Sequence, residues 1–475
     1  MPLLVPLVFG SGLLGVWIMQ RGTPAHARST AIAAALVLTL IGSALAGWIH
    51  FTQQQWTDGT EFALIGEARP LFGLDDFNAP LLPFSSGLVF ILLVGMPRSR
   101  TSATLCGGAL VQLAATWALF ATLDLGLIAV AWLVSVWPAT TLRHGARRMV
   151  AAYMLGSAAL LFVAVVLVAV AARRAGVAAP LSLPDLQAVG GAALEPWRVL
   201  PLLLTAIVIR KGAFPFHSWI PALSSHAGPA APALLVGPQV GAFVLVRVAI
   251  PLFPEALADA LPIIGRVALL AALYGSVVGL AGSDLRRVYG WLVVSQSSLV
   301  LVGLECTDAD GIAGGLVLWL SAGLALTALG VVIEGVEARI GMRSLDRFAG
   351  LRAPRLGALF LLLGLASVGL PGTLGFVAED LLVHGVLESY PGIGAVIILA
   401  TAANGFSVMR AFVRTFYGPV DRDVAVSDVL PRESLVLGGA VVLLVVAGMW
   451  PRPIIDTRAP VAERLSALLG AHDRE

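Results

Sequence analysis

Long apolar runs follow one another along the entire chain, and they restrict the possible folds more than any other feature. The runs are close to the roughly 20 residues that an α-helix needs to cross a bilayer. Only 12% of the 475 residues are charged, whereas a soluble domain carries roughly 25%. In lipid, backbone groups must be hydrogen-bonded within their own segment, and the alternating pattern of a membrane barrel is absent. We therefore expect an all-α polytopic membrane protein.

The apolar runs divide into fourteen predicted spans with no soluble domain between them. The spans cover approximately residues 1–20, 29–50, 80–96, 102–122, 125–142, 148–172, 197–224, 229–253, 262–282, 286–304, 311–336, 355–388, 391–416 and 433–450. The first run lacks a basic leader, so it is predicted to be a retained span. Spans 4–8 and 9–13 are predicted to form two inverted five-helix repeats, residues 102–253 and 254–420. Spans 1–3 precede them in residues 1–101, and span 14 and a tail follow in residues 421–475.

Basic and acidic loops alternate in register with these spans. The basic loops carry Arg21, Arg28, Arg98, Arg100, Arg143, Arg147, Arg148, Arg286, Arg287, Arg339, Arg343, Arg347 and Arg352. The acidic loops carry Asp58, Glu61, Asp75, Asp76, Glu255, Asp259, Glu305, Asp308 and Asp310. Because basic loops usually remain in the cytoplasm, the pattern predicts that both chain termini lie outside. The small net charge of +2 indicates no nucleic-acid partner.

Proline and glycine interrupt two of the spans. Phe214–Pro221 carries two prolines inside span 7, and Leu370–Thr373 carries a Pro-Gly pair inside span 12. Such breaks free backbone groups, which a membrane protein tolerates only where protein or trapped water satisfies them. Transporters with inverted repeats place broken helices at corresponding positions of their two halves. Spans 7 and 12 lie five spans apart, which is the spacing that two five-helix repeats predict.

Ionisable residues flank both breaks and are the main functional candidates. Arg210 and Lys211, the only lysine in the chain, precede the first break, and Glu379 and Asp380 follow the second. Charges at such depth are costly and mark ion or proton pathways by default. A buried lysine can release its proton near neutral pH and a buried carboxyl group can take one up, whereas arginine stays charged. The alternative for each residue is a static role, either snorkelling to an interface or pairing with a fixed counter-charge.

Two further polar residues lie in kinked apolar segments. His217 could relay a proton at neutral pH, or it could cap carbonyl groups that the first break frees. Gln239 cannot titrate, but it can hold water or bridge two helices.

The remaining charged motifs are given structural interpretations. Asp284, Arg286 and Arg287 are assigned to a cytoplasmic loop, and Glu334 and Glu337 are assigned to the interface at the end of span 11. The two cysteines, Cys106 and Cys306, fit no disulfide framework, metal spacing or iron–sulfur site.

The stretch Arg210–Pro221 resembles the broken-helix signature of the antiporter-like subunits of respiratory complex I and of Mrp-type cation/proton antiporters. That signature runs lysine, a few residues, then Pro-Phe-His-x-Trp-Leu-Pro. Asp284–Val288 followed by Ser295-Gln296, and the stretch Leu370–Glu379, are similar to two further segments of the family. The resemblance covers about residues 100–420. It implies a subunit of the bacterial cytoplasmic membrane that conducts protons, with any redox chemistry in partner subunits.

Several positions depart from the family pattern. Leu133 stands where the family has a glutamate after the tryptophan of span 5, and Gln239 stands at the lysine position of span 8. Ala322–Leu326 carries neither the histidine nor the lysine of the family's span 11 motif. Arg210 occupies the lysine position of span 7, with Lys211 one residue later. Either protons follow a different, water-filled path, or this subunit is a scaffold.

The sequence therefore predicts a proton-translocating, antiporter-like subunit of a complex I-like assembly. The predicted proton path consists of Lys211, Glu379, Arg210, His217, Asp380 and Gln239. Its predicted partners are other membrane and peripheral subunits and the lipid bilayer, and no flavin, nicotinamide, iron–sulfur or metal site is expected. Two alternatives stay open: the membrane subunit of a two-component inorganic-carbon uptake system with a zinc carbonic-anhydrase-like partner, and a proton-inert scaffold. The sequence identifies neither the partner complex nor the transported ion.

Overall fold

The computed structural model describes residues 3–52, 54–57, 59–62, 64–141, 145–342, 344–392, 394–419 and 427–470. Three residues of the predicted loop-charge pattern, Asp58, Arg143 and Arg343, lie outside this part of the chain.

Nearly all regular structure in the described residues is helical, as the apolar runs predict. The α-helices are α1 (Leu4–Arg21), α2 (Pro24–Thr52), α3 (Leu81–Gly95), α4 (Ala103–Ala121), α5 (Leu125–Thr141), α6 (Arg147–Arg174), α7 (Leu183–Val189), α8 (Pro196–Lys211), α9 (Trp219–Ala227), α10 (Ala230–Val236), α11 (Val240–Val244), α12 (Ile250–Leu252), α13 (Pro254–Leu280), α14 (Leu285–Leu304), α15 (Ala309–Ile340), α16 (Pro354–Ala366), α17 (Leu374–Ser389), α18 (Val396–Phe416), α19 (Pro431–Met449) and α20 (Arg452–Gly470). Short helical turns are η1 (Arg98–Arg100), η2 (Gly191–Leu194) and the π-helical η3 (Leu245–Ala249). Four two-residue strands pair as β1 (Trp56–Thr57) with β4 (Gly73–Leu74) and β2 (Glu61–Phe62) with β3 (Arg69–Pro70).

Most of these helices are long and apolar enough to cross a bilayer. In the described residues, ten helical segments meet that criterion, and α3, α5 and α16 are shorter apolar helices. The separate parts of an interrupted helix are each too short to cross a bilayer alone, so a count of helices does not test the number of spans. The fourteen spans therefore stay a prediction.

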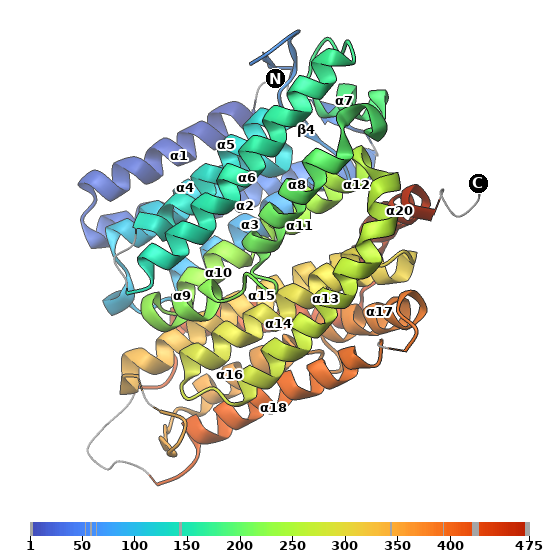
Figure 1. The fold of residues 1–475 in the computed structure, drawn as a ribbon. Helices are drawn as coiled ribbons and strands as arrows, with labels where there is room; N and C mark the ends of the chain where they lie inside the picture. The colour runs from blue at the N-terminus through green and yellow to red at the C-terminus, as the bar shows by residue number, and fades with distance from the viewer. Residues whose placement is uncertain are drawn as a thin grey trace.

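The helices form one bundle in which the earlier and later parts of the chain lie beside each other (Figure 1). α4, α5, α6 and α8 pack in succession on one side, whereas α13, α14 and α18 pack on the other. α15 contacts α3 and α10 as well as α14, α16 and α17, so it joins the two sides. The first residues of α1 and the helix α20 lie at the same end of the bundle (Figure 1). The inverted symmetry of the two predicted repeats stays a prediction.

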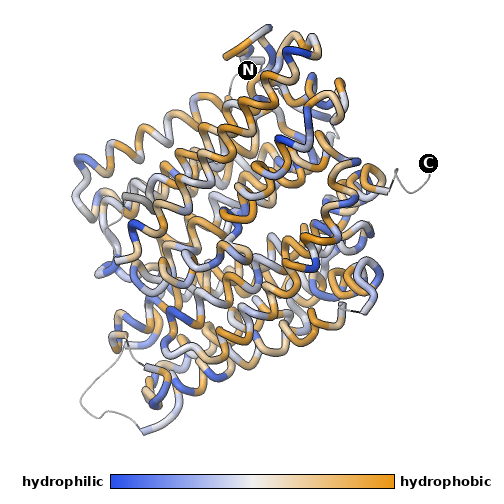
Figure 2. The backbone as a smooth tube through the Cα atoms, viewed as in Figure 1, coloured by the Kyte–Doolittle hydropathy of each residue, from blue (hydrophilic) through white to orange (hydrophobic). Residues whose placement is uncertain are grey.

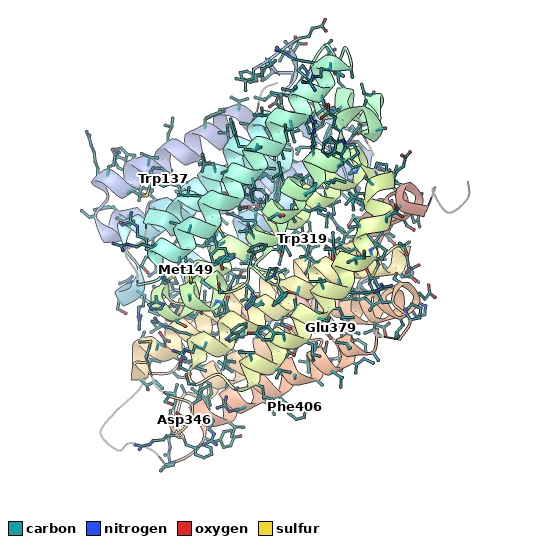
Figure 3. All side chains as sticks on the ribbon, in the orientation of Figure 1. Trp137, Met149, Trp319, Asp346, Glu379 and Phe406 are labelled. Atoms are coloured by element: carbon teal, nitrogen blue, oxygen red, sulfur yellow. The ribbon has the colours of Figure 1, made fainter. Side chains whose placement is uncertain are left out.

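Hydrophobic residues predominate along the middle of the bundle, and hydrophilic residues are more frequent toward its two ends (Figure 2). Large apolar side chains stand exposed on the outer helices, among them Leu40 on α2, Phe162 on α6 and Leu443 on α19. Phe406 points outward from α18, whereas Glu379 and Trp319 lie inside the bundle (Figure 3). An apolar outer surface of this extent is what a lipid environment requires, because water would not solvate it.

Both predicted interruptions are present. α8 ends at Lys211, and Gly212 turns the chain with a φ of 63° before α9 begins at Trp219. α16 ends at Ala366 and α17 begins at Leu374. The segment predicted as span 8 is interrupted too, because Gln239 adopts a left-handed conformation with a φ of 55° between α10 and α11.

The segment after span 14 was predicted as a tail, but it forms a further helix, α20. Ala462, Leu465 and Leu469 bury one face of this helix, which packs against α13 and α15. Arg458 is 1% exposed and donates from Nη1 to the carbonyl oxygen of Phe77 at 2.8 Å. The alternation of apolar and charged residues made this segment too polar to be recognised as a membrane span.

Candidate functional site

Arg210 and Lys211 are both buried at the end of α8, but their side chains point in different directions. The Arg210 guanidinium donates from Nη2 to Ser135 Oγ at 2.9 Å. It also lies 5.6 Å from the centre of the Trp132 ring and 3.7 Å from Met154 Sδ. These partners belong to α5 and α6. Arg210 therefore faces the first half of the bundle, where in the described residues no carboxylate lies within 4.0 Å of it.

Lys211 faces the centre of the bundle instead. Its Nζ donates a hydrogen bond to Gln239 Oε1, at the kink between α10 and α11. Its side chain packs so closely against Gly241 that a Cβ there would lie 2.9 Å from Lys211 Cγ. The predicted residues Lys211 and Gln239 thus meet directly, and both are at most 4% exposed. In the described residues no carboxylate lies within 4.0 Å of Lys211, so no contact ion pair fixes its charge and a neutral state is accessible to it.

The free backbone groups at the end of α8 are satisfied by two other side chains. Trp219 Nε1 donates to the carbonyl oxygen of Ile209 at 2.9 Å, and Ser297 Oγ donates to that of Lys211 at 2.9 Å. His217 was one candidate for this capping role, but these two residues perform it. The break is therefore a stable, closed arrangement around the base of the lysine side chain.

Glu305 lies in the turn between α14 and α15, as its prediction as part of an acidic loop requires, but its carboxylate is buried. It follows the last turn of α14 and is only 2% exposed. Tyr390 covers it and donates from its hydroxyl group to the Glu305 carbonyl oxygen at 2.8 Å, while the carboxyl Oε2 has no hydrogen-bond partner in the described structure. Lys211 and Glu305 act on each other electrostatically, and neither has another charged group with a comparable effect among the described residues.

Glu379 lies in the second turn of α17, just beyond the interruption after α16. It is 8% exposed, and the side chains of Gln296 and Thr401 face its carboxyl group. Gly369, with a φ of 78°, lies directly against Glu379 Oε2, so a Cβ at this position would collide with the carboxylate. Oε1 and both polar atoms of the buried Gln296 amide have no hydrogen-bond partner in the described structure. The interruption thus leaves room for the Glu379 carboxylate, which has no cation within 4.0 Å in the described residues.

Two predicted members of the path lie elsewhere. Asp380 is exposed on the outer side of α17, although it is adjacent to Glu379 in sequence. The His217 ring is half-buried and packs against Phe214, Tyr274 and Trp291, with ring centres 5.3–5.8 Å apart. Phe214 and Tyr274 are themselves exposed on the apolar surface. The structure therefore groups Lys211 with Gln239 and does not bring His217 or Asp380 into contact with them.

A second buried polar cluster lies at the end of the bundle opposite to α20. Arg286 is not in a loop as predicted, because it forms part of the first turn of α14, where Asp284 caps the helix. Its Nη2 lies 2.6 Å from Glu337 Oε2, and Arg100 Nη2 lies 3.6 Å from the same oxygen. Arg286 and Glu337 are separated by 51 residues in sequence, so no local pattern could reveal the pair.

Glu334 lies one turn before Glu337 on α15 and is 2% exposed. In the described residues it has no cation within 4.0 Å, because Arg286 and Arg100 both contact Glu337 instead. Its carboxyl group lies directly against Gly228, between α9 and α10, and faces the N–H group of Ala230. Glu334 was predicted to flank the interface, but it is a buried carboxylate beside the second half of span 7.

Residues 115–404 match the protein family described as NADH:quinone oxidoreductase/Mrp antiporter, TM (transmembrane). The chain belongs to this family. The chain is similar to NADH-quinone oxidoreductase subunit 13 of Thermus thermophilus, with 32% identity over 269 residues, which are 56% of this chain and 57% of that protein. NADH-quinone oxidoreductase subunit M of Mycobacterium tuberculosis is 28% identical over 273 residues, which are 56% of this chain and 49% of that protein. The chain thus spans about half the length of the curated relatives that it matches.

Solved structures of family members share nearly the whole fold. A chain of respiratory complex I from Thermus thermophilus aligns with a TM-score of 0.87 and 27% identity, covering 98% of this chain and all of that one. A chain of the Mrp complex from Dietzia sp. aligns with a TM-score of 0.85 at 18% identity, covering 99% of this chain, and this likeness concerns the fold alone. The protein is therefore a multi-pass membrane protein with the fold of the antiporter-like subunits.

The positions at which the chain departs from the family pattern have different surroundings. Leu133 is 47% exposed on the outer face of α5, so an acid there would point away from Lys211. Leu326 is buried in α15, and its carbonyl oxygen accepts a hydrogen bond from Tyr289. Gln239 remains in contact with the lysine, so the chain retains a polar connection at the kink of span 8.

Proposed function

We propose that this chain is a proton-translocating, antiporter-like membrane subunit of a complex I-like assembly in a bacterial cytoplasmic membrane. The observation that carries the proposal is the buried Lys211, which contacts Gln239 and interacts electrostatically with Glu305. Isolated ionisable groups are expensive inside a membrane, and such groups mark proton pathways. Its family relatives are named as subunits of NADH-quinone oxidoreductases, which supports the choice of assembly.

The proposed route runs along the bundle through groups at three levels. Glu334 lies near the end where α15 finishes, Lys211 and Gln239 lie at the interruptions of spans 7 and 8, and Glu305 lies where α14 finishes at the other end. α14 and α15 are joined by a short turn, so their chain directions are opposite and these two carboxylates stand near opposite ends. Water molecules would have to connect the groups, because they are not in mutual contact.

Glu379 is proposed as a second proton-carrying group, on the side of the second interrupted helix. Arg210 is proposed as a fixed positive charge, because arginine does not lose its proton and its partners are neutral. His217 and Asp380, which the sequence analysis included in the path, are not needed in this route.

The proposed orientation places the basic end of the bundle in the cytoplasm and both termini outside. The start of α1 and the helix α20 lie at one end of the bundle, which supports a common side for the termini (Figure 1). The positive-inside rule then assigns that side to the exterior. Other membrane and peripheral subunits are the proposed partners, since this family works in multi-subunit complexes such as those that contain the relatives.

A comparison of Lys211 with Arg210 tests the proposal. The complete assembly, with the variant chain in place, is reconstituted in vesicles, and dye quenching reports proton uptake. We expect Lys211→Arg to impair proton transport nearly as much as Lys211→Ala, because arginine keeps the charge but lacks an accessible neutral state. Arg210→Lys should have a mild effect, because a lysine can also serve as a fixed charge.

Assembly is checked by the amount of variant chain recovered with its partners, so that a folding defect is not taken for lost transport. Wild-type proton uptake by an assembled Lys211→Arg variant would overturn the relay role of Lys211. The proton-inert scaffold would then be the better explanation.

A further inference from the structure

A cavity lined by three arginines opens between α2, η1 and α19, outside the proposed proton route. Its volume is about 590 Å³. It is lined by Ala25, Arg28, Ser29, Ile32, Val94, Arg98, Thr101 and Arg432. Nothing in the proposed proton chemistry uses these residues.

Backbone carbonyl oxygens hold Arg28 in place, and two of the three arginines have no carboxylate nearby in the described residues. Arg28 is 8% exposed and donates from Nη2 to the carbonyl oxygens of Val94 and Met96, at 2.9 and 2.8 Å, at the end of α3. In the described residues no carboxylate lies within 4.0 Å of Arg28 or Arg98. Arg432 lies 3.7 Å from Glu433 Oε1. The described lining residues of the cavity therefore carry a surplus of positive charge.

Glu433, the one carboxylate within 4.0 Å of these arginines in the described part of the chain, already has a closer partner. Glu433 Oε2 lies 2.8 Å from Arg339 Nη2, and its side chain is only 4% exposed. A single carboxylate shared by two arginines cannot balance Arg28 and Arg98 as well. An anion that enters the cavity would compensate the remaining charge, and guanidinium groups are well suited to bind phosphate oxygens in pairs.

The cavity continues directly into an apolar surface on both of its walls. On α2, Ile32 in the cavity is followed one and two turns later by Leu36 and Leu40, which are 41% and 62% exposed. On α19, Arg432 is followed after one turn by Leu435, which is 78% exposed. The basic cavity thus stands at the boundary between a charged end of the bundle and its apolar side.

We propose that this cavity binds the phosphate headgroup of an anionic phospholipid, whose acyl chains lie along α2 and α19. Basic cavities between membrane helices on the cytoplasmic side are suited to acidic headgroups, because the charge attracts the phosphate while the neighbouring helices accept the chains. Ser29 and Thr101 also line the cavity, but their hydroxyl groups donate to the carbonyl oxygens of Ala25 and Pro97, so the arginines carry the proposed binding. A free phosphate ion would satisfy the arginines but would leave the adjoining apolar walls unused.

The test uses the full-length chain, purified in detergent and stripped of lipid, with phosphatidylglycerol as the probe and phosphatidylcholine as the neutral comparison. Native mass spectrometry measures the bound lipid. Each arginine near an anionic headgroup contributes about fivefold in affinity, so Arg98→Gln/Arg432→Gln should weaken phosphatidylglycerol binding by about 25-fold. The matched control Arg347→Gln/Arg452→Gln removes two exposed arginines elsewhere and should stay within about twofold.

Single variants and thermal unfolding accompany the double variant, so that loss of fold is recognised. Each single variant should lose about fivefold. Equal losses in the control would overturn the proposal, because binding would then depend on overall charge alone. Saturable binding of inorganic phosphate without preferential binding of phosphatidylglycerol would also overturn it, because the ligand would then be a soluble anion.

Discussion

A double-mutant cycle on Lys211 and Glu305 should measure the coupling free energy between these two residues. We consider Lys211→Met, Glu305→Gln and the double substitution in the purified chain. No ion pair within 4.0 Å joins the two groups, so their separation is larger than that. At an effective dielectric constant of about 20, two unit charges interact by about 4 kcal/mol at about 4 Å and by about 2 kcal/mol at about 8 Å. Because the two groups are more than 4.0 Å apart, we expect a coupling above about 0.5 kcal/mol and below about 4 kcal/mol.

The coupling is obtained from unfolding free energies measured in mixed micelles with increasing sodium dodecyl sulfate. Each single substitution leaves one buried charge without its counterpart, so the double variant should lose less stability than the two single losses combined. Arg210→Met combined with Glu305→Gln is the control, because Arg210 points toward Ser135 and Trp132. A coupling for Lys211 and Glu305 no larger than about 0.5 kcal/mol would refute the electrostatic link, since distant sites add within that range.

Three other results should follow from the structure. Glu379→Gln should lower proton uptake by the assembled complex in vesicles. Glu388→Gln, at an exposed position of the same helix, should leave the uptake unchanged. Unchanged uptake in the Glu379→Gln variant would assign Glu379 a static role. Gly369→Ala should also lower uptake, because the new Cβ collides with the Glu379 carboxylate and left-handed backbone costs an alanine about 1–2 kcal/mol. Gly372→Ala is the control, because Gly372 has a φ of 86° and open space around the new Cβ. This variant carries the same backbone cost and should keep its proton uptake. If both glycine variants lost the same amount of uptake, backbone strain alone would explain the loss. In a cysteine-free background, Arg147→Cys should resist a membrane-impermeant thiol reagent added outside intact cells, and rapid labelling there would reverse the proposed topology.

The interrupted helices and the importance of Lys211 could be predicted because their signals are local. Proline and glycine inside an apolar run mark a break, and a single lysine in such a run stands out. The direction of its side chain could not be predicted. Neighbouring residues on a helix point about 100° apart, so Arg210 and Lys211 face different partners, and only the packing of α8 decides which partner each one meets.

Glu305 shows why part of the site remained hidden in the sequence. It ends an apolar run and is followed closely by Asp308 and Asp310, so it has the local appearance of a loop residue. Tyr390, which is 85 residues away, covers it in the structure. Burial of Arg286 against Glu337 has the same cause, since the contact joins two helices that no local pattern relates. α20 was missed because its apolar residues are too few for a span, although their spacing suits a helix lying against α15.

The length of α15 has a mechanical consequence. Its 32 residues contain no proline and extend about 48 Å, whereas the hydrocarbon layer is about 30 Å thick. α15 is therefore a continuous helix whose two ends lie in the polar layers on opposite sides of the membrane. At one end Glu337 forms an ion pair with Arg286, and near the other end α20 packs against α15. If a neighbouring subunit displaced one end of α15 along the helix axis, the other end would move as well. The helix could thus transmit an axial movement across the bilayer without a hinge.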